Sequence, residues 1–151
     1  MCRRTLPAAA AALALAAGGF VAGHSSSFTG EATVTTGCVV RFYSSGPAIH
    51  ENGAHACTAA TGVWVRDNGV LVIDQAHTGP VVSVTAQADE TLVARGVQAG
   101  VSGGVSDAHV TFYDSRLGRV LDLTDPADYR RIAGAYSNLW FQVTQISGED
   151  S

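Results

Sequence analysis

Apolar and polar residues alternate with a period of two through much of this chain. Val40 and Phe42 fall on one face of a predicted strand, and Arg41 and Tyr43 fall on the other. This pattern is typical of a strand with one buried face, and it recurs in the stretches 82–88, 108–113 and 139–146. The alternation predicts an all-β domain over residues 38–147. We expect a compact antiparallel β-sandwich or small barrel of about eight short strands with one short helix.

The strongest local signal is the Asn68-Gly69 pair, which lies between two apolar runs at 63–66 and 70–73. Both residues tolerate a positive φ angle, so the pair predicts a tight β-hairpin. The second run, Val-Leu-Val-Ile, contains no polar residue. It therefore predicts a strand that is covered on both faces.

The single short helix is predicted over residues 126–132. Its first residue is a proline, which suits that position, and Gly134 would follow its end. Thr124 or Asp125 would cap its N-terminus. Three carboxylates recur at every third position here, and they are Asp122, Asp125 and Asp128. Turn formation and helix capping explain them, and calcium binding by the same oxygens is the alternative that the sequence leaves open.

The first 23 residues have the layout of a secretory signal peptide. Arg3 and Arg4 precede an uncharged, alanine-rich stretch at 8–23, and the small residues at its end predict cleavage near Gly23. A retained membrane anchor is the alternative, because about 20 apolar residues suffice to span a bilayer. Alanine and glycine are only weakly apolar, which favours cleavage. The sequence therefore predicts a secreted, extracellular protein with no membrane contact once the leader is removed.

The charge of the chain narrows the range of partners. It has no lysine, nine arginines and thirteen acidic residues, which gives a formal net charge of −4. Loss of Arg3 and Arg4 with the leader would lower this charge by two further units. No basic stripe would remain to neutralise phosphate groups, so nucleic acid is not expected as a partner. The heavy use of Arg, Ala and Gly indicates a gene rich in G and C, as in actinobacteria.

Two cysteines remain after the leader, which itself carries Cys2. Exported proteins commonly join such a pair, so we expect a disulfide between Cys38 and Cys57. The bond would close a loop of about 20 residues and stabilise the fold by about 3 kcal/mol through the unfolded state. A metal or redox pair would call for closer spacing and further thiols.

Two short motifs resemble catalytic signatures but lack the context that the chemistry needs. Residues 100–104 match the G-x-S-x-G pattern of hydrolases. The stretch 91–101 is expected to be extended, and no helix is expected after Ser102, so a glycine-rich turn is predicted there. His50 and His55 flank Glu51 much as in zinc proteases, but they are five residues apart with a glycine between them. We predict no catalytic residue, no metal site and no cofactor.

Binding to a partner is expected to use a polar N-terminal arm and exposed aromatic side chains. The arm spans residues 24–37 and is expected to be flexible, and its β-branched residues can add a strand to a partner. Exposed Trp and Tyr side chains anchor many protein interfaces and sugar sites. The candidate partner-binding residues are Thr33, Val34, Thr35, Tyr43, Trp64, Tyr113 and Trp140. Residues 148–151 are expected to form a disordered tail.

These features favour a secreted, non-enzymatic protein-binding module, such as an adaptor or a subunit of an exported, toxin-like complex. Its partner would be another secreted protein, bound through the N-terminal arm. Two alternatives remain open. A cell-wall or carbohydrate-binding protein would use the same aromatic residues for stacking on sugars, and a secreted protease inhibitor would place the arm in a protease cleft.

In its plan, the chain resembles the small adaptor subunits of the secreted umbrella toxin particles of Streptomyces. The likeness lies in the export signal at 1–23, the N-terminal segment at 24–37, the pair Cys38 and Cys57, and the compact β domain. The resemblance implies an adaptor that joins a lectin-type subunit, related to trypsin, to a large toxin backbone and has no catalysis of its own. No motif matches residue by residue, so the resemblance assigns no site residue.

Overall fold

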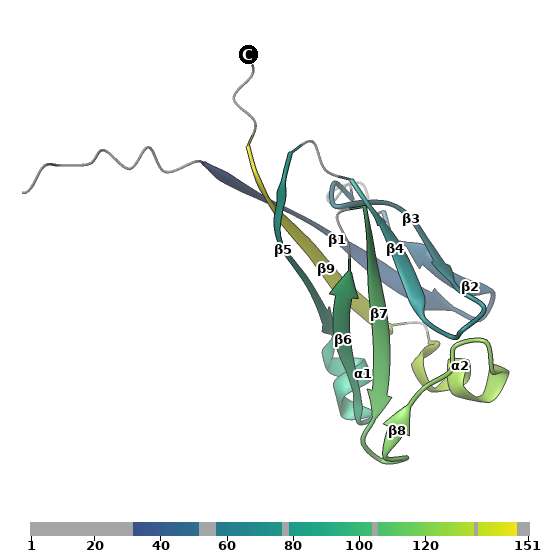
Figure 1. Ribbon diagram of the computed structural model, residues 1–151. Coiled ribbons are helices and arrows are strands. Elements are labelled where there is room, and N and C mark those ends of the chain that lie inside the picture. The colour runs from purple at the N-terminus through teal and green to yellow at the C-terminus, as the bar shows by residue number, and fades with distance from the viewer. Residues whose placement is uncertain (1–31, 52–56, 77–78, 104–105, 135, 148–151) are drawn as a thin grey trace, which may run out of the picture.

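The strands form two antiparallel sheets in the computed structural model of the chain (Figure 1). The structure describes residues 32–51, 57–76, 79–103, 106–134 and 136–147. Within these ranges it has nine strands and two short helices. The strands are β1 (Thr33–Tyr43), β2 (Gly46–Ile49), β3 (Ala60–Val65), β4 (Leu71–Gln75), β5 (Val81–Ala88), β6 (Val97–Gly103), β7 (Asp107–Asp114), β8 (Arg119–Val120) and β9 (Asn138–Ile146). The helices are α1 (Glu90–Ala94) and α2 (Pro126–Ile132).

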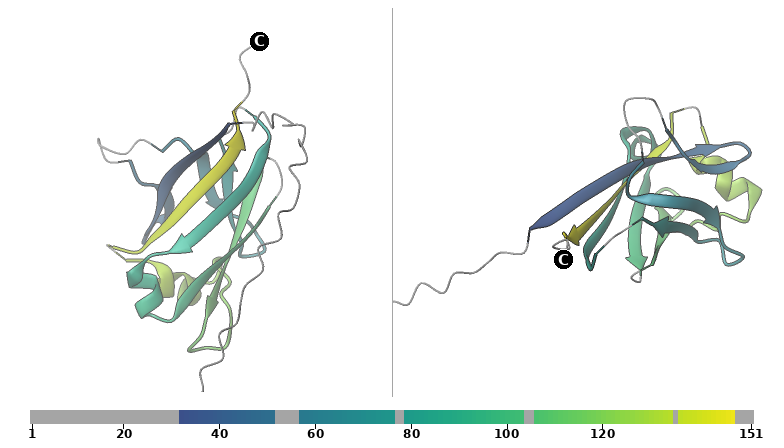
Figure 2. Two further views of the ribbon diagram at one scale, coloured as in Figure 1. Left: turned by 90° about the vertical axis from the view of Figure 1, so that its left-hand side faces the viewer. Right: turned by 90° about the horizontal axis from the view of Figure 1, so that it is seen from above.

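The two sheets are the layers of a sandwich. The first sheet has the strand order β2-β1-β9-β5, and the second has the order β3-β4-β7-β6 with β8 paired to β7. Figure 2 shows the long strands β1, β9 and β5 running side by side in one layer. The predicted all-β, antiparallel sandwich is confirmed, and the described strands form two separate sheets rather than one closed barrel.

The core lies between the sheets and is filled by the inward-facing residues of the alternating pattern. Phe42 of β1, Phe112 of β7 and Phe141 of β9 are all fully buried. The rings of Phe42 and Phe112 meet edge to face, with centroids 5.4 Å apart and planes at 89°. This arrangement places the positive edge of one ring against the negative face of the other. These contacts join the two sheets across the middle of the sandwich.

The register of β1 and β9 fixes which side chains face solvent on the first sheet. Val39 lies opposite Trp140, and Cys38 lies opposite Phe141. Because side chains alternate between the two faces of a strand, Trp140 and Gln142 share the outer face. Phe141 points into the core, as the alternation predicted.

The predicted hairpin is confirmed between β3 and β4, but its turn differs from the expected one. Among the described residues only glycines have a positive φ, and Gly69 is one of them at +77°, so Asn68 keeps a negative φ. The amide of Gly69 donates to the carbonyl oxygen of Arg66 at 2.8 Å, and the amide of Arg66 donates to Val70 at 2.9 Å. Leu71, Val72 and Ile73 are all fully buried, which confirms a strand covered on both faces.

The stretch 91–101 was predicted to be extended, and this is wrong for its first part. Asp89 caps α1 there, and its side chain accepts a hydrogen bond from the amide of Leu92 at 2.9 Å. Leu92 is fully buried and fixes the helix on the core. The expected glycine-rich turn is also wrong at Ser102 and Gly103, because both residues belong to β6 and pair with β7.

Candidate functional site

The N-terminal half of β1 is an edge of the first sheet. β9 pairs with β1 from Thr33 to Arg41, whereas β2 pairs only with the segment that begins at Val40. Between these limits, Gly37 and Val39 accept backbone hydrogen bonds from Thr58 and His50. For residues 33–36, no described strand pairs with the edge that faces away from β9. Figure 1 shows this part of β1 projecting from the body of the sandwich.

The backbone groups at this edge can be assigned from the hydrogen bonds of the neighbouring residues. The carbonyl groups of Gly37 and Val39 point away from β9, and the carbonyl group of Ala32 accepts from Ser147 on the β9 side. In an antiparallel pair this direction alternates from one residue to the next. The N–H and C=O groups of Thr33 and Thr35 therefore point to the open edge.

The side chains of this segment do not protect the edge. The predicted binding residues Thr33, Val34 and Thr35 are all exposed, and Val34 is 43% exposed. The segment has no lysine, proline or bulge, which are the usual devices that keep an edge strand from pairing. Thr35 is held by a hydroxyl contact of 2.9 Å with Thr144 on β9. This segment of β1 is thus paired with β9 on one side, and no described strand pairs with its other side.

The predicted aromatic candidates are exposed but do not form one patch. Trp140 lies on the outer face of the first sheet, and Tyr43 lies at the far end of β1, where its hydroxyl is 3.4 Å from Nδ1 of His50. Trp64 on β3 and Tyr113 on β7 belong to the second sheet. A patch that uses all four is excluded because the sandwich sets the two sheets back to back.

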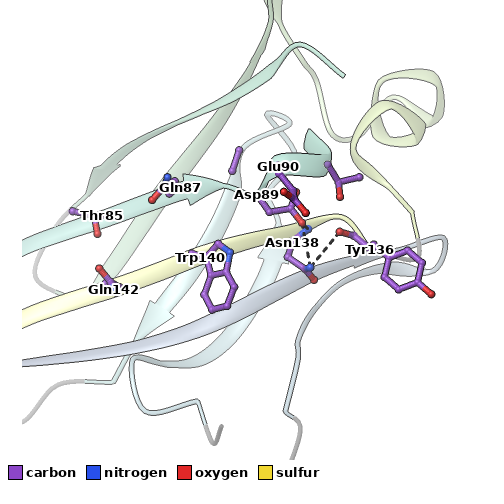
Figure 3. A pocket seen from close by; sticks show the side chains of 10 residues that line it. Thr85, Gln87, Asp89, Glu90, Tyr136, Asn138, Trp140 and Gln142 are labelled. Atoms are coloured by element: carbon purple, nitrogen blue, oxygen red, sulfur yellow. Dashed lines mark hydrogen bonds between the residues drawn. The ribbon is translucent and has the colours of Figure 1, made fainter. Parts of the chain in front are cut away.

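A cleft of about 1100 Å³ lies beside Trp140 on the outer face of the first sheet (Figure 3). It runs along β9 and β5 to the start of α1. Figure 3 shows Trp140 between Gln142 at one end and Tyr136 at the other. The lining residues are Thr85, Gln87, Ala88, Asp89, Glu90, Thr91, Tyr136, Asn138, Trp140 and Gln142. We call this feature the Trp140 cleft.

A hydrogen-bond network holds one end of the Trp140 cleft. Asp89 accepts from both the backbone amide and the side-chain amide of Asn138, at 2.9 and 3.2 Å. The amide oxygen of Asn138 accepts from Nε of Arg41 at 3.0 Å, and its nitrogen also donates to the carbonyl oxygen of Tyr136. Asn138 is therefore fully engaged and acts as a positioning residue. The sequence analysis missed this network because its partners are 49 and 97 residues apart along the chain.

Ser102, His109 and Asp107 meet on the outer face of the second sheet, but not as a catalytic triad. Ser102 lies opposite His109 across β6 and β7. Nε2 of His109 is 3.1 Å from Asp107, and Asp107 is also 3.6 Å from Arg66. The described hydrogen bonds include none between Ser102 and His109. The serine thus lacks the contact with a base that would activate it.

The three regularly spaced carboxylates have structural partners. Asp125 caps α2 by accepting from the amide of Ala127 at 2.7 Å, which confirms the predicted helix and its cap. Asp122 accepts from the amide and hydroxyl of Thr124. Asp128 is buried and binds Arg119 through both oxygens, at 2.6 and 2.7 Å. The hydrogen bond with Arg119 holds the pKa of Asp128 below its usual value. The described residues contain no group of three or more His, Cys, Asp or Glu side chains placed to hold a metal ion.

The predicted disulfide is not formed in the structure, where Cys38 and Cys57 are both free thiols. The two thiols are nevertheless neighbours. Burial and a hydrogen bond with Cys57 raise the pKa of Cys38 well above its usual value. The thiol of Cys57 also donates to the carbonyl oxygen of Ala60 at 3.3 Å. The fold therefore brings the pair together without a covalent bond.

Several sequence predictions fall outside the described residues. They concern the leader at 1–23, most of the arm at 24–37, the second histidine of the 50–55 motif and the tail at 148–151. The described part of the arm begins β1 at Thr33, so the predicted domain boundary at Cys38 lies inside a strand. In the ranges that the structure describes, no helix is long and apolar enough to cross a membrane.

Comparison with known proteins gave no match. No protein-family model, curated protein or solved structure matches the chain. The features that bear on function are therefore the two surfaces described above, the open edge of β1 and the Trp140 cleft.

Proposed function

We propose that this protein is a secreted, non-enzymatic adaptor that binds another secreted protein along the open edge of β1. The observation that carries the proposal is the set of outward-pointing backbone groups at Thr33 and Thr35, with which no described strand pairs. An extended segment of a partner would form main-chain hydrogen bonds with these groups and extend the first sheet by one strand. The resemblance to toxin adaptors, which rests on the chain's plan, supports an exported complex as the setting.

The open edge would recognise its partner through backbone hydrogen bonds and through side-chain contacts. Backbone hydrogen bonds would supply affinity without regard to sequence, and exposed side chains such as Val34 would favour apolar or β-branched residues in the added strand. The acidic net charge of −4 favours a partner surface with basic residues. A non-enzymatic role is consistent with the described hydrogen bonds, which include none between Ser102 and His109.

Secretion and the disulfide belong to the same proposal. The leader would direct export, and the neighbouring thiols of Cys38 and Cys57 would be oxidised outside the cell. The bond would tie β1 to the segment that precedes β3, next to the open edge. It would close a loop of about 20 residues, which is worth about 3 kcal/mol in the entropic model. Sequencing the N-terminus of the protein recovered from culture supernatant tests the export step.

The experiment that tests the adaptor role replaces one backbone donor. In Thr35→Pro the N–H group that points to the open edge is lost, but no backbone hydrogen bond with β9 is removed, and proline is tolerated at such edge positions. Thr35→Ala is the matched control, because it also loses the hydroxyl contact with Thr144 but keeps the N–H. Each tagged variant is expressed in the native host and purified from the supernatant.

We expect the wild-type protein and Thr35→Ala to recover the same secreted partner in a fixed ratio, and Thr35→Pro to recover at least about tenfold less of it. Circular dichroism checks that the fold is retained in all three proteins. If Thr35→Pro retains its fold and recovers as much partner as Thr35→Ala, strand addition at this edge is wrong.

A further inference from the structure

We propose that the Trp140 cleft is a binding site for a neutral oligosaccharide, separate from the open edge of β1. Trp140 retains 55% of its exposure and Tyr136 retains 75%, although both side chains are large and aromatic. Both residues contribute to the lining of the cleft, and Figure 3 shows the ring of Tyr136 at its end, directed away from Trp140. An exposed indole ring within a concave site indicates a ligand with an apolar face.

The polar side chains of the lining indicate which polar groups the ligand carries. The cleft places the side-chain amides of Gln87 and Gln142 next to Trp140, and the hydroxyl group of Thr85 lies next to Gln142. The register sets Gln87 directly opposite Trp140, and Thr85 directly opposite Gln142, across β5 and β9. Side-chain amides offer both donors and acceptors, and hydroxyl groups offer both as well. Such a lining suits a ligand that carries many hydroxyl groups.

A pyranose ring combines these two properties. Its C–H groups form an apolar face, which packs against the negatively polarised face of an aromatic ring. Its hydroxyl groups lie around the edge, where the side chains of Gln87, Gln142 and Glu90 can hydrogen-bond them. The cleft follows β9 from Asn138 to Gln142, a distance of about 13 Å at the usual rise per residue, and continues to Tyr136 in the preceding turn. That length accommodates more than one sugar ring in a row.

The charge of the cleft disfavours anionic ligands, and the polarity of its lining disfavours aliphatic ones. None of its described lining residues is basic, and Asp89 and Glu90 make it acidic. A phosphorylated or sulfated ligand would meet repulsion there and find no cation among the described lining residues. Arg41 lies beside the cleft, but its guanidinium group is engaged with Asn138. An aliphatic ligand would leave the hydrogen-bonding groups of the lining without partners. A neutral oligosaccharide meets neither obstacle.

The site is rigid where a ligand would bind. Trp140 and Gln142 lie on the central strand β9, which is paired on both sides, to β1 and to β5. Asn138, held by Asp89 and Arg41, fixes the end of the cleft near Tyr136. A site on paired strands loses little conformational entropy when it binds. Trp140 and the open edge at Thr33 are also about 20 Å apart along the sheet, so the two surfaces can be tested separately.

The test uses the secreted protein and four neutral tetrasaccharides, built from glucose with α-1,4 links, glucose with β-1,4 links, mannose and N-acetylglucosamine. Binding is measured by isothermal titration calorimetry for the wild-type protein, Trp140→Ala and Trp64→Ala. Trp64 is the matched control because it is the only other tryptophan, is 44% exposed and lies on the opposite sheet. In Trp64→Ala the remaining fluorescence comes from Trp140 alone and reports on the cleft directly.

We expect at least one tetrasaccharide to bind the wild-type protein and Trp64→Ala equally and to shift the fluorescence of the latter. Trp140→Ala should weaken this binding at least about tenfold, as loss of a central aromatic anchor does. Thr35→Pro should bind the sugar normally, so the outcome does not depend on the adaptor role. The inference is overturned if no tetrasaccharide binds at about 10 mM, or if Trp140→Ala binds as tightly as wild type. It is also overturned if Trp140→Ala loses the protein partner while no sugar binds.

Discussion

The turn between β3 and β4 provides a sharp test of how the second sheet is packed. Gly69 adopts a φ of +77°, and a Cβ atom added there would lie 2.2 Å from Oδ1 of Asp122 and 3.0 Å from its Cα. The carbonyl oxygen of Gly69 also accepts a hydrogen bond from the amide of Leu123 at 3.1 Å. Gly69→Ala therefore combines an unfavourable backbone angle with a steric overlap.

Gly118 separates these two effects. It also has a positive φ, +68°, but nothing lies within 4 Å of an added Cβ. In Gly118→Ala the left-handed conformation costs about 1–2 kcal/mol, partly offset by about 0.4–1 kcal/mol from the restricted unfolded chain. We expect a net loss of about 1 kcal/mol. Gly69→Ala adds an overlap of the kind that costs about 1–3 kcal/mol, which brings its total loss to about 3 kcal/mol.

Equilibrium unfolding in urea, followed by tryptophan fluorescence, measures both losses. A difference of about 2 kcal/mol between the variants corresponds to about 1 M urea at a typical slope. Asp122→Ala removes the nearest two atoms but also loses the hydrogen bonds from Thr124. Measured against Asp122→Ala alone, the added change Gly69→Ala should therefore cost close to what Gly118→Ala costs. Equal losses for Gly69→Ala and Gly118→Ala would refute the reasoning, since Asp122 would then move aside without resistance.

Three further predictions concern acid stability, the thiols and the open edge. Burial alone would raise the pKa of Asp114, but hydrogen bonds with Arg131 and two backbone amides outweigh it, so this pKa lies below its usual value of 3.8. Its stabilisation is then full above about pH 4 and is lost as the pH falls further, so Asp114→Asn should flatten the acid limb of a stability profile measured by thermal unfolding. Mass spectrometry of the secreted protein after alkylation in denaturant should find Cys38 and Cys57 unmodified, and reduction should lower the free energy of unfolding by about 3 kcal/mol; full alkylation in denaturant without reduction would contradict the disulfide. Hydrogen exchange should find the amide of Thr35 fast in the free protein and protected in the complex, and an unchanged rate would argue against strand addition.

The strands could be predicted from the sequence because buried and exposed positions alternate along them. β9 was predicted to within one residue, since Leu139, Phe141 and Val143 alternate with Trp140, Gln142 and Thr144 and are all buried. α1 was missed because it is only five residues long and lies where β-branched residues favour a strand. Its one readable signal was Asp89 as a capping residue three positions before Leu92.

The two candidate surfaces could be predicted only in part, because local sequence patterns do not record which strands become neighbours. The β-branched character of residues 33–36 indicated a strand able to pair at an edge, and the structure places it there. The Trp140 cleft could not be assembled from the sequence, because its lining comes from β5, α1 and β9, and no local pattern records which strands become neighbours. The same limit applies to the aromatic candidates, which the sequence identified as exposed but could not assign to opposite sheets.

The sequence by itself determined the all-β class, the faces of the main strands and the short helix after Asp125, because these depend on local alternation and capping. The tertiary structure alone decided the strand order, the open edge at Thr33 and Thr35, and the cleft beside Trp140. These features depend on which strands pair across long separations in the chain. That choice is made by the collective packing of the core rings, and no single segment specifies it.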